Sequence, residues 1–106
     1  MITFDEFKNI ELRVALVTAC EPHPNADKLW VLTIDLGSEQ RQLVAGLKQY
    51  YSAEEIVGKK IVIVANLAPA TRRGVESNGM LLAAEADGVV SLLTLDKDLP
   101  AGATVS

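Results

Sequence analysis

Alternation of hydrophobic and polar residues is the clearest pattern in the first half of the chain. Residues 10–20 are predicted to form one long, half-buried β-strand, in which Ile10, Leu12, Val14 and Leu16 alternate with Glu11, Arg13, Ala15 and Val17. Two more strand-like runs, at 28–36 and 41–45, flank a turn at Gly37-Ser38. The segment 21–27 holds two prolines and several turn-forming residues, so it separates the first strand from the second.

Two capping boxes mark the beginnings of short helices. Thr3-Phe4-Asp5-Glu6 predicts a helical turn over Thr3–Lys8, and Ser52-Ala53-Glu54-Glu55 predicts a helix that ends at Gly58. The remaining segments are expected to form, in order, a buried strand at Lys60–Asn66, a polar loop at Pro69–Gly79, an apolar run at Met80–Ala84, a strand at Val89–Leu95 and a turn at Pro100–Gly102.

Three strands, a short helix and then more strands is the element order of the OB-fold, a five-stranded oligonucleotide/oligosaccharide-binding barrel. We therefore predict one all-β domain over residues 1–106, with the helix between the third and fourth strands. An SH3-like barrel and a small sandwich remain alternatives, but neither explains the capped helix equally well. The N-terminal turn and the strands after Ala84 are additions to a minimal barrel. Added strands at the edge of a sheet must be covered, and a partner chain is one way to cover them.

Composition places the chain among folded domains. Of its 106 residues, 49% are hydrophobic and 23% are charged, unlike a disordered segment. No apolar run approaches the ~20 residues of a membrane-spanning helix, and the first ten residues lack the pattern of a signal peptide. The single cysteine, Cys20, cannot form an internal disulfide, so a cytoplasmic location is expected.

Charge is distributed unevenly along the chain. The formal net charge is −4, which argues against a general binder of polyanions. Between residues 41 and 73, however, six lysines and arginines face only two acids. Such an asymmetry suits a site-directed nucleic-acid binder, because attraction is confined to one region. The alternative is that these charges solvate separate faces.

Catalytic motifs are absent from the sequence. His23 is the only histidine, which excludes a metal site with two histidines. Cys20 and His23 are three positions apart, as a nucleophile and its base could be, but a buried cysteine and a histidine within a turn explain them better. Phosphate-binding glycine loops and the G-x-S-x-G motif are also missing. We predict no catalysis, no metal and no cofactor.

Four segments carry a family resemblance: His23–Leu29, Val44–Leu47, Ala65–Leu67 and Arg73–Ala83. Together they resemble the structure-specific tRNA-binding domain that occurs at the C-terminus of many bacterial methionyl-tRNA synthetases and as a stand-alone protein. The resemblance implies an OB-fold that binds tRNA by shape and has no chemistry of its own. It also implies a homodimer built by the terminal additions to the barrel, and a partnership with a synthetase.

The candidate tRNA contacts centre on the segment 70–80. Two adjacent arginines can bind phosphates and stack on a base, and the serine and methionine of the family's S-x-G-M motif match Ser77 and Met80. The complete set of candidates is Arg72, Arg73, Ser77, Asn78, Met80, Lys28, Asn66, Arg13 and Lys48.

Structural alternatives exist for several of these residues. Segment 70–80 could be a solvated glycine-rich turn, and Lys28 could be a solvated strand end. Asn66 could hydrogen-bond the turn that leads to Pro69, and Arg13 could pair with Glu11 or Asp35. Alternation places Trp30 in the core or in a dimer interface rather than on an RNA-binding surface.

Three functions are consistent with the sequence. The first is an accessory tRNA-binding module of a methionyl-tRNA synthetase, which raises the local concentration of tRNA. The second is a secretion-related homodimeric chaperone of the same fold that binds unfolded polypeptide. The third, a simple dimerisation appendage, leaves Arg72 and Arg73 unexplained.

Overall fold

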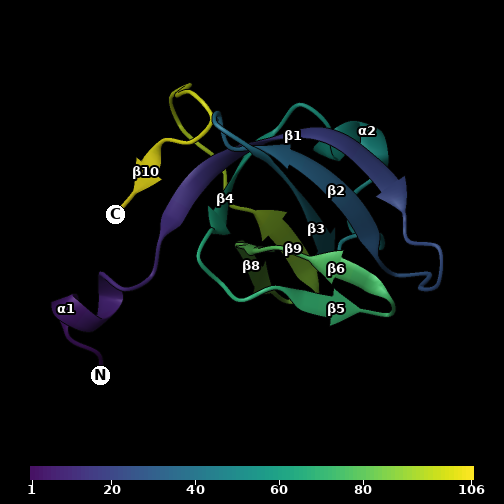
Figure 1. Ribbon diagram of the computed structural model, residues 1–106. Helices are drawn as coiled ribbons and strands as arrows, with labels where there is room; N and C mark the ends of the chain where they lie inside the picture. Colours follow the sequence, from purple (N-terminus) through teal and green to yellow (C-terminus); the bar gives the residue numbers. More distant parts are fainter.

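Ten strands and two short helices make up the computed structural model, which describes residues 1–106 (Figure 1). In chain order they are α1 (Phe4–Phe7), β1 (Leu12–Pro22), β2 (Trp30–Asp35), β3 (Gln40–Ala45), α2 (Ala53–Ile56), β4 (Lys60–Val64), β5 (Ala70–Arg72), β6 (Val75–Ser77), β7 (Met80–Leu81), β8 (Ala83–Ala86), β9 (Val89–Leu92) and β10 (Thr104–Val105). Neither helix is long and apolar enough to cross a membrane.

A single curled sheet forms the body of the molecule. Its strands follow the order β3-β2-β1-β4-β7, and β10 also pairs with β1. The segment between β6 and β7 then meets the free edge of β3, where the backbone N–H of Asn78 donates to the carbonyl of Gln42 at 2.8 Å. This contact brings the two ends of the sheet together. The predicted all-β class and the predicted helix between the third and fourth strands are confirmed.

The interior of the curl is filled by alternating aliphatic residues. Leu32 and Ile34 of β2 and Ile61 and Ile63 of β4 are completely buried, as period-two strands with one buried face require. Trp30 is buried with them, and its indole N–H donates to the carbonyl of Tyr51 at 2.9 Å. The prediction that Trp30 belongs to the core is therefore confirmed.

Strand boundaries differ from the sequence prediction in several places. The largest difference is at 69–79, where we predicted a polar loop and the structure has the β5–β6 hairpin. Because the side chains there are mostly polar, the sequence shows no strand pattern, although the segment forms two three-residue strands joined by a two-residue turn. The strand predicted over Val89–Leu95 ends at Leu92. The main sheet consists of the five strands β3-β2-β1-β4-β7 and of the additional C-terminal strand β10, which pairs with β1.

Both capping boxes are present. Thr3 and Glu6 cap α1 reciprocally, and Ser52 and Glu55 do the same for α2. The two helices differ in burial: α2 places Ile56 in the core, whereas α1 buries no residue and stands clear of the barrel in Figure 1.

Candidate nucleic-acid interface

The β5–β6 hairpin presents the two arginines that the sequence singled out. Its turn consists of Arg73 and Gly74, with φ angles of +53° and +88°, and positive φ at both positions is the pattern of a type I′ hairpin turn. Arg72 and Arg73 are both exposed. The three ion pairs of the structure involve other cations, so both guanidinium groups remain without a carboxylate partner.

The hairpin is fastened to the turn between β1 and β2. The Nε2–H of His23 donates to the carbonyl oxygen of Arg72 at 2.8 Å, and its Nδ1 accepts from the backbone N–H of Asn25 at 2.9 Å. The side-chain amide of Asn25 donates to the carbonyl oxygen of Arg73 at 3.3 Å. On the other side, Gln42 of β3 donates from Nε2 to the carbonyl oxygen of Glu76 at 2.9 Å. The arginines are therefore carried by a braced hairpin.

Lys28 lies close to Arg73, as both line a hollow of about 440 Å³. The hollow's other walls come from Ala26, Asp27 and Leu29 of the same turn. Lys48 lies at this end of the barrel too, because its ammonium nitrogen is 5.1 Å from the centre of the ring of Trp30, the first residue of β2. Four of the predicted candidates are thus gathered around one turn and one hairpin.

The S-N-G-M segment connects β6 to β7 and closes the sheet. The Ser77 hydroxyl is buried; it donates to the carbonyl of Gly79 at 3.1 Å and accepts from the N–H of Val44 at 3.0 Å. Gly79 has φ +123°, and a Cβ there would lie 3.1 Å from the carbonyl oxygen of Val64. Met80 is 47% exposed and Asn78 is half-buried. The segment therefore has a buried structural part and an accessible part.

Arg13 and Asn66 lie away from this cluster and have partners inside the protein. Arg13, near the opposite end of β1, makes an ion pair with Glu11 at 2.5 Å. Asn66 accepts from the N–H of Glu11 at 2.8 Å and donates to the carbonyl of Asn9 at 2.7 Å. Arg13 therefore has the Glu11 partner considered for it, whereas Asn66 bonds the backbone before β1 rather than the turn that leads to Pro69.

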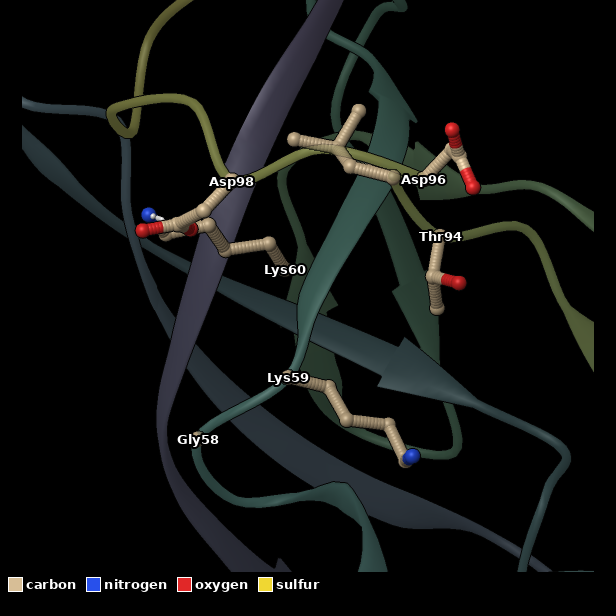
Figure 2. Close-up of a pocket in the computed structure, with 7 residues that line it drawn as sticks. Gly58, Lys59, Lys60, Thr94, Asp96 and Asp98 are labelled. Carbon is tan, nitrogen blue, oxygen red and sulfur yellow. Dashed lines mark hydrogen bonds and ion pairs between the residues drawn. The ribbon is translucent and has the colours of Figure 1, made fainter.

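Ion pairs with acidic residues outside the segment reduce the excess positive charge of residues 41–73. Arg41 binds Glu39 and the carbonyl of Ala65, while Lys60 binds Asp98 at 2.6 Å and the carbonyl of Leu99. Figure 2 shows the second hollow of the surface, of about 400 Å³, in which Asp98 faces Lys60 and the side chains of Lys59 and Asp96 extend away from that pair. Two lysines and two aspartates line it, so its charges balance.

The groups considered for catalysis have other roles. Both ring nitrogens of His23 are engaged by backbone groups. Burial, assisted by the charge of Glu21, raises the pKa of the Cys20 thiol to about 11, which keeps it protonated and unreactive at neutral pH. No three His, Cys, Asp or Glu side chains are grouped so that they could hold a metal ion.

The residues that hold the hairpin cannot be identified from sequence patterns. The sequence marks His23 and Asn25 only as parts of a turn and of a family motif, and no pattern marks Gln42. The motif H-P-N-A-D-K-L contains the first two, but their partners lie 48 to 49 positions further on. Only the folded chain shows that this motif holds the arginine hairpin.

The chain is similar to several known proteins. The protein family described as "Putative tRNA binding domain" matches residues 12–104. The chain belongs to this family. Its relatives include a protein named methionine–tRNA ligase from Methanococcus maripaludis, 55% identical over 105 residues, which are 99% of this chain and 16% of that protein. The chain thus spans about one sixth of that relative's length.

Two solved structures have the same fold over the whole chain. The MetRS-related protein from Pyrococcus horikoshii has a TM-score of 0.94 and 38% identity, covering 100% of this chain and 98% of that one. The chaperone CsaA from Bacillus anthracis has a TM-score of 0.91 and 31% identity, covering 100% and 99%. Both kinds of protein expected from the sequence are therefore structural neighbours.

Proposed function

We propose that the chain binds tRNA by shape, without catalysis, through a surface centred on the braced β5–β6 hairpin. The observation that supports this proposal is the pair of exposed arginines without carboxylate partners, one of which, Arg73, lies beside Lys28. Because the hairpin is held in place by hydrogen bonds, its cations have fixed positions. They therefore favour an RNA whose phosphates have the same spacing. Asn78, Met80 and Lys48 extend the contact surface. Arg13, Asn66 and the Ser77 hydroxyl are engaged internally, so we propose no direct contact for them.

The proposed role is accessory to a methionyl-tRNA synthetase in the cytoplasm. A second, weak tRNA contact makes the enzyme's own encounter with tRNA effectively intramolecular and so raises the local concentration of tRNA. Relatives named methionine–tRNA ligase, of which this chain corresponds to 16%, support an arrangement in which the module and the enzyme act on the same tRNA. Adding the chain to a synthetase that lacks such a module should lower its KM for tRNA.

We further propose that two copies of the chain assemble through their terminal elements. Helix α1 is only four residues long, buries no side chain and leaves Phe4 72% exposed. So short a helix is not stable without packing, and a second copy would supply it. Sedimentation of the wild type should show a dimer that Phe4→Ser weakens, while Val57→Ser, at another exposed apolar residue, leaves it intact.

The test of the function is a titration of the chain against mixed tRNA and a straight RNA duplex at two salt concentrations. Preferential, salt-sensitive binding of tRNA is expected. The logarithm of the tRNA affinity falls linearly with the logarithm of the salt concentration, and the steepness of this line is the salt slope. The double variant Arg72→Ala/Arg73→Ala should lower the salt slope by about 1–2, in proportion to the number of phosphates that the two arginines neutralise. The control Lys59→Ala/Lys97→Ala removes the same charge away from the hairpin and should leave the slope unchanged. Equal binding to both RNAs would contradict shape selection.

Binding of unfolded polypeptide is the second candidate, because one structural neighbour is named a chaperone. Exposed apolar side chains at Phe4 and Met80 would favour it. A chain that suppresses aggregation of a denatured model protein but does not bind tRNA would support this function instead of the first.

A further inference from the structure

The hollow between residues 26–29 and Arg73 is the one concave surface at the braced hairpin. Its volume of about 440 Å³ falls within the range of small-molecule sites, ~300–1,000 Å³. Its two walls are joined by the hydrogen bonds from His23 to Arg72 and from Asn25 to Arg73. The hollow is therefore formed before any ligand arrives.

Arg73 occupies a backbone position that an arginine does not favour. Its φ of +53° is almost that of Asp87, at +51°, and Asp87-Gly88 forms the corresponding turn of the β8–β9 hairpin. Asn, Asp and Gly are the residues that such turns favour. The guanidinium of Arg73 makes no hydrogen bond or ion pair in compensation. An arginine at this position, with no internal partner for its guanidinium group, points to a ligand outside the chain.

The lining combines three kinds of chemistry. Lys28 and Arg73 can neutralise a phosphate, and the planar guanidinium of Arg73 can also stack on a base. Ala26 and Leu29 provide apolar surface, while the Asp27 carboxylate can only accept hydrogen bonds, for which a ribose hydroxyl or an exocyclic amine is a donor. A free phosphate would use the cations alone. A paired nucleotide keeps its base faces stacked inside the duplex.

We propose that this hollow binds one unpaired ribonucleotide of the RNA, with its phosphate at Lys28 and Arg73 and its base against Leu29. The inference rests on the tRNA-binding function proposed above and adds a subsite to it. The charge-balanced hollow at Lys60 and Asp98 offers an anionic nucleotide no such attraction.

The experiment is a titration of the ¹⁵N-labelled chain with the four nucleoside 5′-monophosphates and, separately, with inorganic phosphate, followed by amide shifts. We expect saturable shifts at residues 26–29 and 73–74, with nucleotides binding about fivefold or more tightly than phosphate, because the base buries apolar surface against Leu29. Ala26→Leu should fill the hollow and remove this preference without changing charge. Arg73→Asn should weaken both ligands, whereas Lys97→Ala should affect neither.

Equal affinity for phosphate and nucleotides would overturn the subsite, as would the absence of saturable shifts at these amides. Binding of tRNA is measured on the same samples, so the two proposals can fail separately. A chain that binds tRNA but shows no nucleotide preference retains the proposed function and loses the subsite. Circular dichroism of each variant confirms that it is folded; if Ala26→Leu does not fold, Leu29→Ala, which removes the apolar wall, should also reduce the preference.

Discussion

The imidazole of His23 donates a hydrogen bond from Nε2 to the carbonyl oxygen of Arg72 at 2.8 Å, across 49 positions of sequence. The same ring accepts from the N–H of Asn25 through Nδ1, which fixes its neutral tautomer. A backbone carbonyl can only accept, so no other tautomer satisfies both contacts. The turn after β1 therefore determines where the arginine hairpin lies.

Replacing His23 tests this brace. His23→Ala should increase amide exchange throughout 70–77 and lower tRNA affinity by about three- to tenfold, because one hydrogen bond of ~1 kcal/mol no longer orders the hairpin before binding. His23→Gln retains a side-chain donor and should recover part of both effects. Exchange rates and tRNA titrations are the measurements. Unchanged exchange at the hairpin in His23→Ala would show that the brace is not needed.

Arg73→Asn should separate stability from binding. Asparagine adopts the left-handed conformation more easily, so the free energy of unfolding should rise by up to about 1 kcal/mol. Affinity for tRNA should fall, and the salt slope should decrease by about 1, because one phosphate is no longer neutralised. Chemical denaturation and tRNA titrations at several salt concentrations measure the two effects.

The β8–β9 turn provides the matched control for that substitution. Asp87→Arg makes the opposite change at the same backbone geometry, with φ +51° in place of +53°. It should destabilise the chain by a similar amount and leave tRNA binding unchanged. An Arg73→Asn variant that is less stable than the wild type would contradict the argument that arginine is unfavourable there.

Local signals in the sequence predicted the local parts of the fold. The boxes Thr3–Glu6 and Ser52–Glu55 act within one helical turn, so both helix starts were located correctly. Alternation within β2 correctly predicted that Trp30 is buried. Successive side chains of a strand point to opposite faces of the sheet, so Trp30 shares a face with Leu32 and Ile34. The β5–β6 hairpin is not predicted from sequence because its strands have only three residues each, β5 is exposed throughout, and neither strand carries an apolar alternation.

The candidate site depends on contacts between distant segments, which sequence patterns do not reveal. The family resemblance pointed to Ser77 as a tRNA contact, yet the hydroxyl is buried because the segment after β6 crosses the edge of β3. Asn66 was also a candidate, and its amide is used to hold the backbone before β1. The charge of Arg72, Arg73 and Lys28 makes them candidates from the sequence alone, whereas the hydrogen bonds that hold the hairpin cannot be predicted from it.

The Cys20 thiol gives a pH-dependent prediction. Its pKa is raised to about 11 in the folded chain, mainly by burial and also by Glu21, from an ordinary value of 9.0. Below pH 9 the thiol is protonated in both states and stability is unaffected. Between pH 9 and 11 only the unfolded chain ionises, so stability falls as pH rises. Cys20→Ala should lose less stability than the wild type over this interval in denaturation series at about pH 8, 9.5 and 10.5. Rapid labelling of the native thiol at pH 7 would contradict the raised pKa.

Ser77→Ala distinguishes a structural serine from a tRNA contact. Removing the hydroxyl leaves the N–H of Val44 and the carbonyl of Gly79 without their partner in a buried place, which should lower the free energy of unfolding by about 1–3 kcal/mol. Ser91→Ala, at an exposed serine of β9, should change it by less than about 0.5 kcal/mol. At a temperature where both variants remain folded, Ser77→Ala should bind tRNA much more tightly than the double arginine variant does, because the serine acts by closing the sheet. Wild-type stability together with a loss of tRNA binding would instead place the Ser77 hydroxyl on the RNA.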